Sequence, residues 1–224
     1  MSFLTKGSDF IIEQGLPVVV SVIYLKYLKV ENQRSVFERL VECAENYYSQ
    51  YKDIKISHVS GVNHARQLFR ALGIDPTKRR PSSEALLNRA LKKQSLYQIN
   101  TLVDVGNWCS LDFLLPIGIY DAQKLSGRVR LEKGTEKDAY IGLNNRELHF
   151  NNRYVLKDDI GAFGSPILDS KRTCIELDTT DAILILYAPV SYPIENLSQN
   201  MQLLTNRCID YCGGEVVFTN VYKN

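Results

Sequence analysis

Three polar side chains share one face of an otherwise apolar segment near the middle of the chain. Residues 99–121 read INTLVDVGNWCSLDFLLPIGIYD, and Asn100, Asp104 and Asn107 stand at positions i, i+4 and i+7 within it. This spacing places them on one face of a helix. If the face is covered, its polar groups must be hydrogen-bonded. The stripe therefore predicts either structural bonds, with Asp104 receiving backbone N–H groups or pairing with an arginine, or the wall of a polar pocket.

A second polar cluster precedes an apolar run near residue 180. The segment LDSKRTCIELDTTDA (168–182) brings Asp169, Ser170 and Arg172 together. These side chains could stabilise a tight turn, or they could offer an anion or hydroxyl contact at the mouth of a pocket. No histidine is close in sequence to Ser170, so a catalytic triad is not expected.

The common catalytic and metal-binding patterns are absent from the sequence. There is no Walker loop, dinucleotide fingerprint, HExxH or G-x-S-x-G motif. The three histidines are scattered, and the five cysteines show no spacing typical of a zinc site or a disulfide framework. We therefore expect no metal and no cofactor, and we expect Cys208 and Cys212 to face the core.

Length and composition are those of an ordinary globular protein. The chain has 224 residues, 45% of them hydrophobic, and a net charge of +2. We expect a single domain over residues 1–224, with two small subdomains as the alternative. No secretory signal is visible in the N-terminal stretch, and the longest apolar run, 16–25, is about half a membrane span. Together with five cysteines that show no disulfide pattern, this favours a cytoplasmic protein with no membrane partner.

Positive charge concentrates in one part of the chain. Between Arg66 and Lys93 there are eight basic residues against two acidic ones. Such a local excess can hold a few phosphates, and Lys78, Arg79 and Arg80 are the predicted phosphate contacts. A solvated basic surface without a ligand is the alternative.

Hydrophobic periodicity predicts an α+β protein, with helices concentrated in the first half and a mixed sheet in the second. The expected helices cover 30–51, 62–73, 84–93, 99–113 and 191–214. The expected strands cover 18–28, 54–61 and 215–222, with several short ones joined by turns after Leu114.

Three blocks, in this order, resemble a known family. They are RRPSSEALLNRALKK, the segment 99–121, and GAFGSPILDSKRTCIELDTTDAILILYA. Together they resemble the editing domain of the phenylalanyl-tRNA synthetase beta subunit over roughly residues 60–185, and most of all the small stand-alone proteins built from that domain. The resemblance implies an α+β fold in which helices pack on a mixed β-sheet or β-sandwich of unusual topology.

The resemblance also implies a function. The family domain binds the acylated 3′ end of tRNA and hydrolyses a mischarged aminoacyl ester, so a stand-alone copy is expected to do this in trans and to ligate nothing. The implied pocket residues are Asn100, Thr101, Asp104, Asn107, Gly118, Gly164, Ser165, Asp169, Ser170 and Arg172. The resemblance assigns no catalytic group.

Two positions depart from the family pattern and keep other functions open. Gly118 stands where the family has an editing-site histidine, and Leu186 stands where a glutamate recognises the tyrosine hydroxyl. One alternative is therefore a non-catalytic module that binds tRNA or a small ligand such as an amino acid or nucleoside. Another is a small-molecule enzyme that uses the same pocket.

Overall fold

The computed structural model describes residues 9–223. The first eight residues of the N-terminal stretch, where no secretory signal was expected, lie outside the described residues. The α-helices within this range are α1 (Arg34–Tyr51), α2 (Val62–Ala71), α3 (Ser82–Leu91), α4 (Thr101–Phe113) and α5 (Ile194–Cys212). Two short 3-10 helices, η2 (Ile56–His58) and η3 (Ala122–Lys124), lie in connections.

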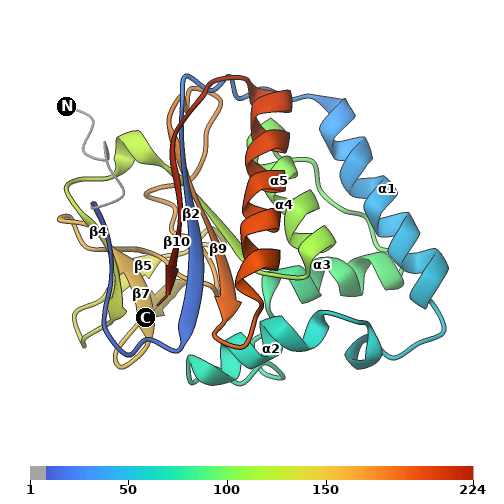
Figure 1. The fold of residues 1–224 in the computed structure, drawn as a ribbon, viewed down its shortest axis with the longest axis horizontal. Helices are drawn as coiled ribbons and strands as arrows, with labels where there is room; N and C mark the ends of the chain where they lie inside the picture. The colour runs from blue at the N-terminus through green and yellow to red at the C-terminus, as the bar shows by residue number, and fades with distance from the viewer. Residues whose placement is uncertain (1–8, 224) are drawn as a thin grey trace.

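The strands are β1 (Phe10–Ile12), β2 (Val18–Lys26), β3 (Ile117–Asp121), β4 (Val129–Lys133), β5 (Ala139–Ile141), β6 (Glu147–His149), β7 (Tyr154–Lys157), β8 (Ala162–Gly164), β9 (Ala182–Pro189) and β10 (Glu215–Lys223). They are short except for three of eight or nine residues, β2, β9 and β10. The expected α+β class is confirmed, because four of the five α-helices lie in the first half of the described chain and eight of the ten strands lie in the second (Figure 1).

Two four-stranded sheets pack face to face. One is antiparallel with the order β10-β2-β9-β3, and the other is mixed with the order β1-β4-β7-β8, where β1 and β4 are parallel. Alternate residues of β2 and β9, such as Val20 and Ile185, meet Leu131 and Phe163 of the second sheet in one buried cluster. This arrangement is the expected β-sandwich.

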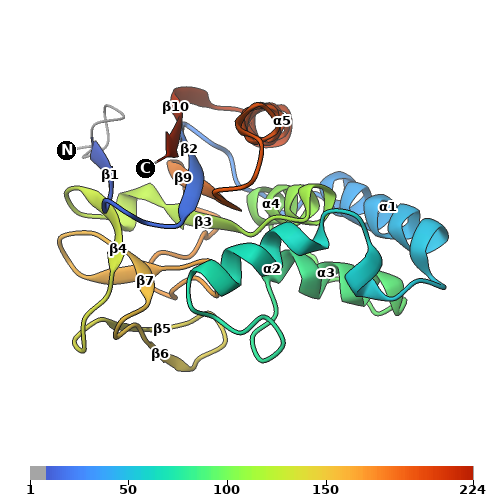
Figure 2. The ribbon, with the colours of Figure 1, turned by 60° about the horizontal axis from the view of Figure 1, so that its bottom comes forward.

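The antiparallel sheet is also covered on its other face. Ile23 of β2 and Leu184 of β9 pack against α4 and α5, including Leu102 and Cys208. All eight residues of β9 are therefore buried, which explains its nearly continuous apolar sequence. Figure 2 shows α5 end-on above the sheet and α1, α3 and α4 grouped beside it.

The strand predicted over 54–61 is wrong. The segment contains η2, whose His58 and Val59 N–H groups bond to the carbonyls of Lys55 and Ile56. Its alternation of apolar residues matches a strand, but Val59 packs into a cluster formed by helices, where no strand edge is available. The segment ends at Gly61, whose φ of +95° turns the chain into α2.

Within residues 9–223, none of the helices combines the length and apolar character that a membrane crossing requires.

Candidate functional site

A cavity of about 400 Å³ lies between α4, β3 and the segment that joins β8 to β9. Its size is in the range of small-molecule sites, and its walls are mostly apolar. The lining residues are Ser82, Ile99, Val103, Gly106, Asn107, Ser110, Ile117, Ile119, Leu143, Ser165, Pro166, Ile167, Leu168, Asp169, Cys174 and Ile175. Of the sequence-predicted site residues, the cavity brings together Asn107, Ser165 and Asp169.

Close packing of α4 on β3 shapes one wall of this cavity. Gly106 of α4 lies so near the strand that a Cβ atom there would be 2.1 Å from Cδ1 of Ile119. Any larger residue would push the Ile119 side chain, which itself lines the cavity. The glycine in this helix therefore sets how near the helix stands to the strand.

The segment 169–173 covers the outer edge of β3. This strand ends its sheet, so some of its N–H groups have no partner strand. The Ile119 N–H donates to the Asp169 carboxylate, and the Asp121 N–H donates to the Thr173 carbonyl at 2.9 Å. The sheet edge thus fixes Asp169 at the cavity wall.

Asp169 supplies the carboxyl group of the cavity lining. The Tyr120 hydroxyl donates a hydrogen bond of 2.6 Å to its Oδ1 atom. Burial of the carboxyl group raises its pKa to about 7, while the bonds from Tyr120 and from Ile119 N–H oppose this rise because they stabilise the charged form. A carboxyl group that titrates near neutral pH can accept a proton from water and return it.

Tyr120 lies between the two sheets in the buried core. Its hydroxyl is 3.4 Å from that of Tyr187, and burial raises the pKa of both phenols well above the ordinary value. Both phenols therefore stay protonated at neutral pH, and Tyr120 remains a donor to Asp169.

Gly118 and Gly164 provide the space for Tyr120. A Cβ atom at Gly118 would lie 2.2 Å from the Tyr120 hydroxyl, and one at Gly164 would lie 2.5 Å from the ring. Neither glycine is among the residues that line the cavity. At position 118, where the resembling family has a histidine, the adjacent space is therefore occupied by the hydroxyl that bonds Asp169.

Ser165 holds the turn that leads to Asp169. Its hydroxyl is 2.9 Å from the Tyr140 hydroxyl and accepts the Ile167 N–H at 3.3 Å. Tyr140 also donates to the Leu168 carbonyl. These bonds fix the backbone immediately before the carboxylate.

Asn100, Thr101 and Asp104 form the N-terminal cap of α4 and lie outside the cavity lining. The Asn100 side chain accepts the Val103 N–H at 3.0 Å, and Asp104 accepts the Ile99 N–H at 3.0 Å. Thr101 bonds to the backbone of Glu31 through both its N–H and its hydroxyl. The polar stripe is thus divided: Asn107 lines the cavity, whereas Asn100 and Asp104 accept hydrogen bonds from backbone N–H groups.

Asp104 carries a buried oxygen without a bond. Its Oδ2 atom has no hydrogen-bond partner within residues 9–223. Burial raises the pKa of this carboxyl group to about 6, and the bond from Ile99 opposes the rise. Asp104 is consequently a cost to stability when charged.

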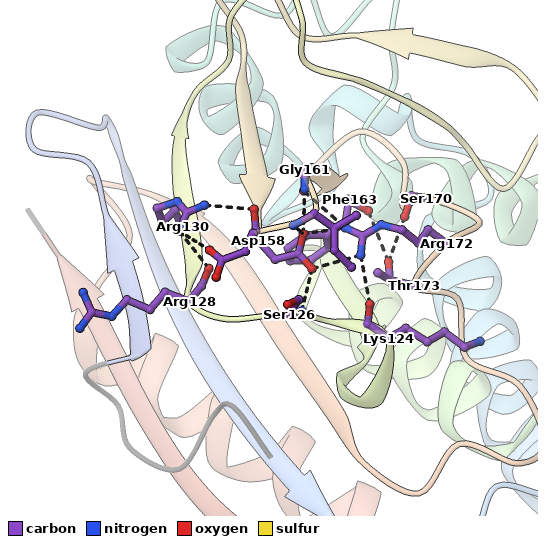
Figure 3. A network of polar contacts seen from close by, with 12 residues as sticks. Lys124, Ser126, Arg128, Arg130, Asp158, Gly161, Phe163, Ser170, Arg172 and Thr173 are labelled. Atoms are coloured by element: carbon purple, nitrogen blue, oxygen red, sulfur yellow. Dashed lines mark hydrogen bonds and ion pairs between the residues drawn. The ribbon is translucent and has the colours of Figure 1, made fainter. Parts of the chain in front are cut away.

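Arg172 and Ser170 belong to a different network, shown in Figure 3. Arg172 makes a bidentate pair with the fully buried Asp158, at 2.9 and 3.1 Å. Asp158 also accepts the N–H groups of Ser126, Ile160 and Gly161. The Ser170 hydroxyl lies 3.0 Å from that of Thr173. Neither Ser170 nor Arg172 lines the cavity.

The three predicted phosphate contacts, Lys78, Arg79 and Arg80, lie in two different surroundings. Arg80 lies 3.5 Å from Glu84, which Arg66 already holds through two bonds of 2.7 Å. Lys78 and Arg79 instead line a smaller cavity of about 230 Å³ together with Arg153.

A larger cavity of about 720 Å³ lies between α1, α4 and α5. Its charged groups largely pair with one another: Arg207 bonds Asp112 at 2.8 Å, and Arg39 bonds Glu42 at 2.9 Å. It therefore offers a ligand fewer unpaired charged groups than the cavity that Asp169 lines. In the described part of the chain, no three His, Cys, Asp or Glu side chains gather as a metal site would need.

Sequence reasoning missed Tyr120, Leu143 and Arg153. Tyr120 and Asp169 are 49 residues apart, and nothing in the local pattern links them. Leu143 is an exposed apolar residue in a turn, which is the one signal that could have found it.

The model of the B3/4 domain family matches residues 64–210, which is more than half of the chain. The chain belongs to the B3/4 domain family.

Curated relatives of this B3/4 domain protein are phenylalanine–tRNA ligase beta subunits. That of Wolbachia sp. subsp. Brugia malayi is 29% identical over 108 residues, covering 47% of this chain and 14% of its own. That of Mycoplasma pneumoniae is 30% identical over 116 residues, covering 51% and 14%. The chain therefore spans about one seventh of these relatives. A solved structure, an N-terminal fragment of the phenylalanyl-tRNA synthetase beta subunit from Pyrococcus horikoshii, has a TM-score of 0.48 and 11% identity, over 96% of this chain and 54% of the fragment.

Proposed function

We propose that this B3/4 domain protein binds the acylated 3′ end of a tRNA in the Asp169 cavity and hydrolyses the aminoacyl ester in trans. One observation carries the catalytic part of the proposal. Asp169 combines a fixed position at the cavity wall with a pKa of about 7, raised by burial. Membership of the family, and its presence in subunits named for tRNA charging, support tRNA as the partner.

The chemistry requires only water and one proton carrier. Asp169 accepts a proton as a water molecule adds to the ester carbonyl carbon. The resulting tetrahedral intermediate collapses, the bond to the ribose oxygen breaks, and the protonated Asp169 returns its proton to that oxygen. The products are the free amino acid and the deacylated tRNA, so atoms and charge balance.

The cavity walls indicate which amino acids would enter. Val103, Ile117, Ile119 and Ile175 provide apolar contacts, and Asn107 is a neutral polar group among them. An apolar or aromatic side chain would bury its surface there, whereas a charged side chain would have no counter-charge except Asp169. We therefore expect apolar aminoacyl esters to be the preferred substrates.

Deacylation of a panel of aminoacyl-tRNAs tests this function. Each tRNA carries one radiolabelled amino acid, and release is followed with and without the protein. The expected result is accelerated release from tRNAs that carry apolar or aromatic residues and little from those that carry lysine or aspartate. Release at the uncatalysed rate from every member of the panel would contradict the enzymatic claim.

A non-catalytic binding module is the second candidate, and Leu186 favours it. This residue stands at the position of the family's specificity glutamate. It is fully buried in β9 and packs with Leu197 of α5. Its side chain therefore belongs to the core rather than to the cavity. Binding of tRNA with a steep salt dependence and no turnover would select this candidate. A thermal shift with free amino acids or nucleosides, and none with tRNA, would favour a small-ligand protein.

A further inference from the structure

A small basic cavity adjoins the Asp169 cavity. Its cations come from two segments far apart in sequence: Lys78 and Arg79 from the loop between α2 and α3, and Arg153 from the turn before β7. Its volume of about 230 Å³ leaves room for a small anion. Asp75 is its acidic lining residue.

Ile167 stands between the two cavities. This residue lines both the basic cavity and the Asp169 cavity, and it lies two positions before Asp169. A single ligand could therefore reach both, with an anionic group on one side of Ile167 and an apolar group on the other.

The positive charge of the basic cavity is available for a ligand. Within residues 9–223, the side chains of Arg79 and Arg153 form no hydrogen bond or ion pair, whereas the Lys78 charge is near enough to Asp75 to help lower the pKa of that carboxyl group. Asp75 is occupied locally, since it accepts the N–H and the hydroxyl of Thr77 at 2.9 and 2.7 Å. Three cations against one carboxylate leave a net charge of about +2, which favours a phosphate group.

We propose that Lys78, Arg79 and Arg153 hold a phosphate of the same ligand whose other end enters the Asp169 cavity. The identity of that ligand as a nucleotide ester rests on the proposed function, whereas the anion site itself rests on the charges and the geometry. The recognised class is thus a nucleotide that carries an apolar group at one end and a phosphate at the other. The phosphate could be the diester of a polynucleotide or the monoester of a mononucleotide.

Binding of matched ligands tests the subsite. The probe is a non-hydrolysable amide analogue of 3′-aminoacyl adenosine, prepared with and without a 5′-phosphate, and a short CCA trinucleotide version supplies the diester. In the full chain, Arg153→Ala is expected to weaken binding of the phosphate-bearing probes by roughly tenfold and to leave the probe without phosphate unchanged. A loss confined to the trinucleotide would identify the diester as the recognised group.

A charge-matched control accompanies this variant. Arg128 is an exposed arginine outside both cavities, and Figure 3 shows its side chain extending away from the Asp158 network. Arg128→Ala should therefore leave all probes unchanged. Asp75→Asn keeps an acceptor for Thr77 and removes the opposing charge, so it should strengthen binding of the phosphate-bearing probes. Equal losses for Arg153→Ala and Arg128→Ala, or an Arg153→Ala effect on the probe without phosphate, would overturn the subsite.

Inorganic phosphate separates a failure of the subsite from a failure of the proposed function. Its titration is followed by NMR of the arginine Nε–H groups. A saturable shift at Arg153 that Arg128 does not share supports the anion site, even if no nucleotide probe binds; that second result would count against the proposed function only. If the nucleotide probes bind and Arg153 responds neither to them nor to phosphate, the subsite is refuted while the proposed function stands.

Discussion

At the scale of single residues, Asp158, Asp104 and Asp169 have three different roles. Asp158 is paired with Arg172 and accepts three backbone N–H groups. Asp104 accepts one N–H group and leaves Oδ2 unbonded among the described residues. Asp169 receives the Tyr120 hydroxyl and lines a cavity. Of the three, Asp169 lines a space that a substrate could enter.

The pH dependence of deacylation should report the titration of Asp169. A general base must be unprotonated, so the rate above background should rise with pH and level off above a midpoint near 7. The Tyr120 hydroxyl stabilises the charged carboxylate and holds its pKa down. Tyr120→Phe should therefore move the midpoint to higher pH.

This shift is measured as a pH–rate profile under single-turnover conditions. Tyr154→Phe is a suitable control, because Tyr154 lies in β7 outside the cavity. A midpoint that moves downward, or that is the same in the parent and Tyr120→Phe proteins, would show that the titrating group is not the carboxylate that Tyr120 contacts.

At the scale of elements, the site depends on how α4 and β3 meet. The stripe spacing correctly predicted the helix, and the structural reading of Asp104, a bond from backbone N–H, agrees with its contact to Ile99. Local spacing carries such information because helix caps involve neighbouring residues. The cavity itself could not be predicted, because Ile119 and Asp169 meet only after β3 has become a sheet edge.

Gly106→Ala tests the close contact between these two elements. Alanine has the higher helix propensity, by up to about 1 kcal/mol, but its Cβ would require Ile119 to move. The contacting atom is the end of a side chain that lines the cavity, so the cavity should change more than the fold. We expect a melting temperature within a few degrees of the parent value, and ligand affinity reduced several-fold.

Calorimetry measures the melting temperature and probe titration measures the ligand affinity, both on the same preparation. The helix substitution Ser35→Ala, at an exposed position of α1 outside the cavity lining, is the control for general effects on preparation and stability. Strong destabilisation without a change in affinity would mean that α4 and β3, rather than the Ile119 side chain, absorb the extra methyl group.

At the scale of the whole molecule, two carboxyl groups should make stability fall as pH rises. The pKa of Asp104 is raised to about 6 and that of Asp169 to about 7. Between the ordinary aspartate pKa and these values, the folded protein binds more protons than the unfolded chain. The free energy of unfolding that these groups contribute therefore decreases with rising pH through this window.

Asp104→Asn should remove the pH-dependent contribution of Asp104 to the free energy of unfolding. The difference in unfolding free energy between pH 4 and pH 6.5 should change by about 2 kcal/mol relative to the parent, with the variant falling less. Urea unfolding at both pH values measures it. Asp178→Asn, at an exposed position, is the control and should leave the slope unchanged. An equal slope in Asp104→Asn would mean that Asp104 titrates as in the unfolded chain.

Much of the fold was predictable from the apolar pattern. β2 and β9 are so consistently apolar that their burial on two faces follows from composition. The prediction of a strand over 54–61 was wrong because it rested on local alternation alone, whereas the residues that this segment packs against belong to helices. Arg153 could not be associated with Lys78 and Arg79, because the sandwich brings together segments more than seventy residues apart.

The most direct test of the central claim compares the parent protein with Asp169→Asn in single-turnover deacylation of the best substrate from the panel. The asparagine keeps an acceptor for Tyr120 and removes the base. The account predicts that release falls by roughly a hundredfold while the affinity for the non-hydrolysable probe changes little. Full hydrolysis by Asp169→Asn, with binding intact, would contradict it.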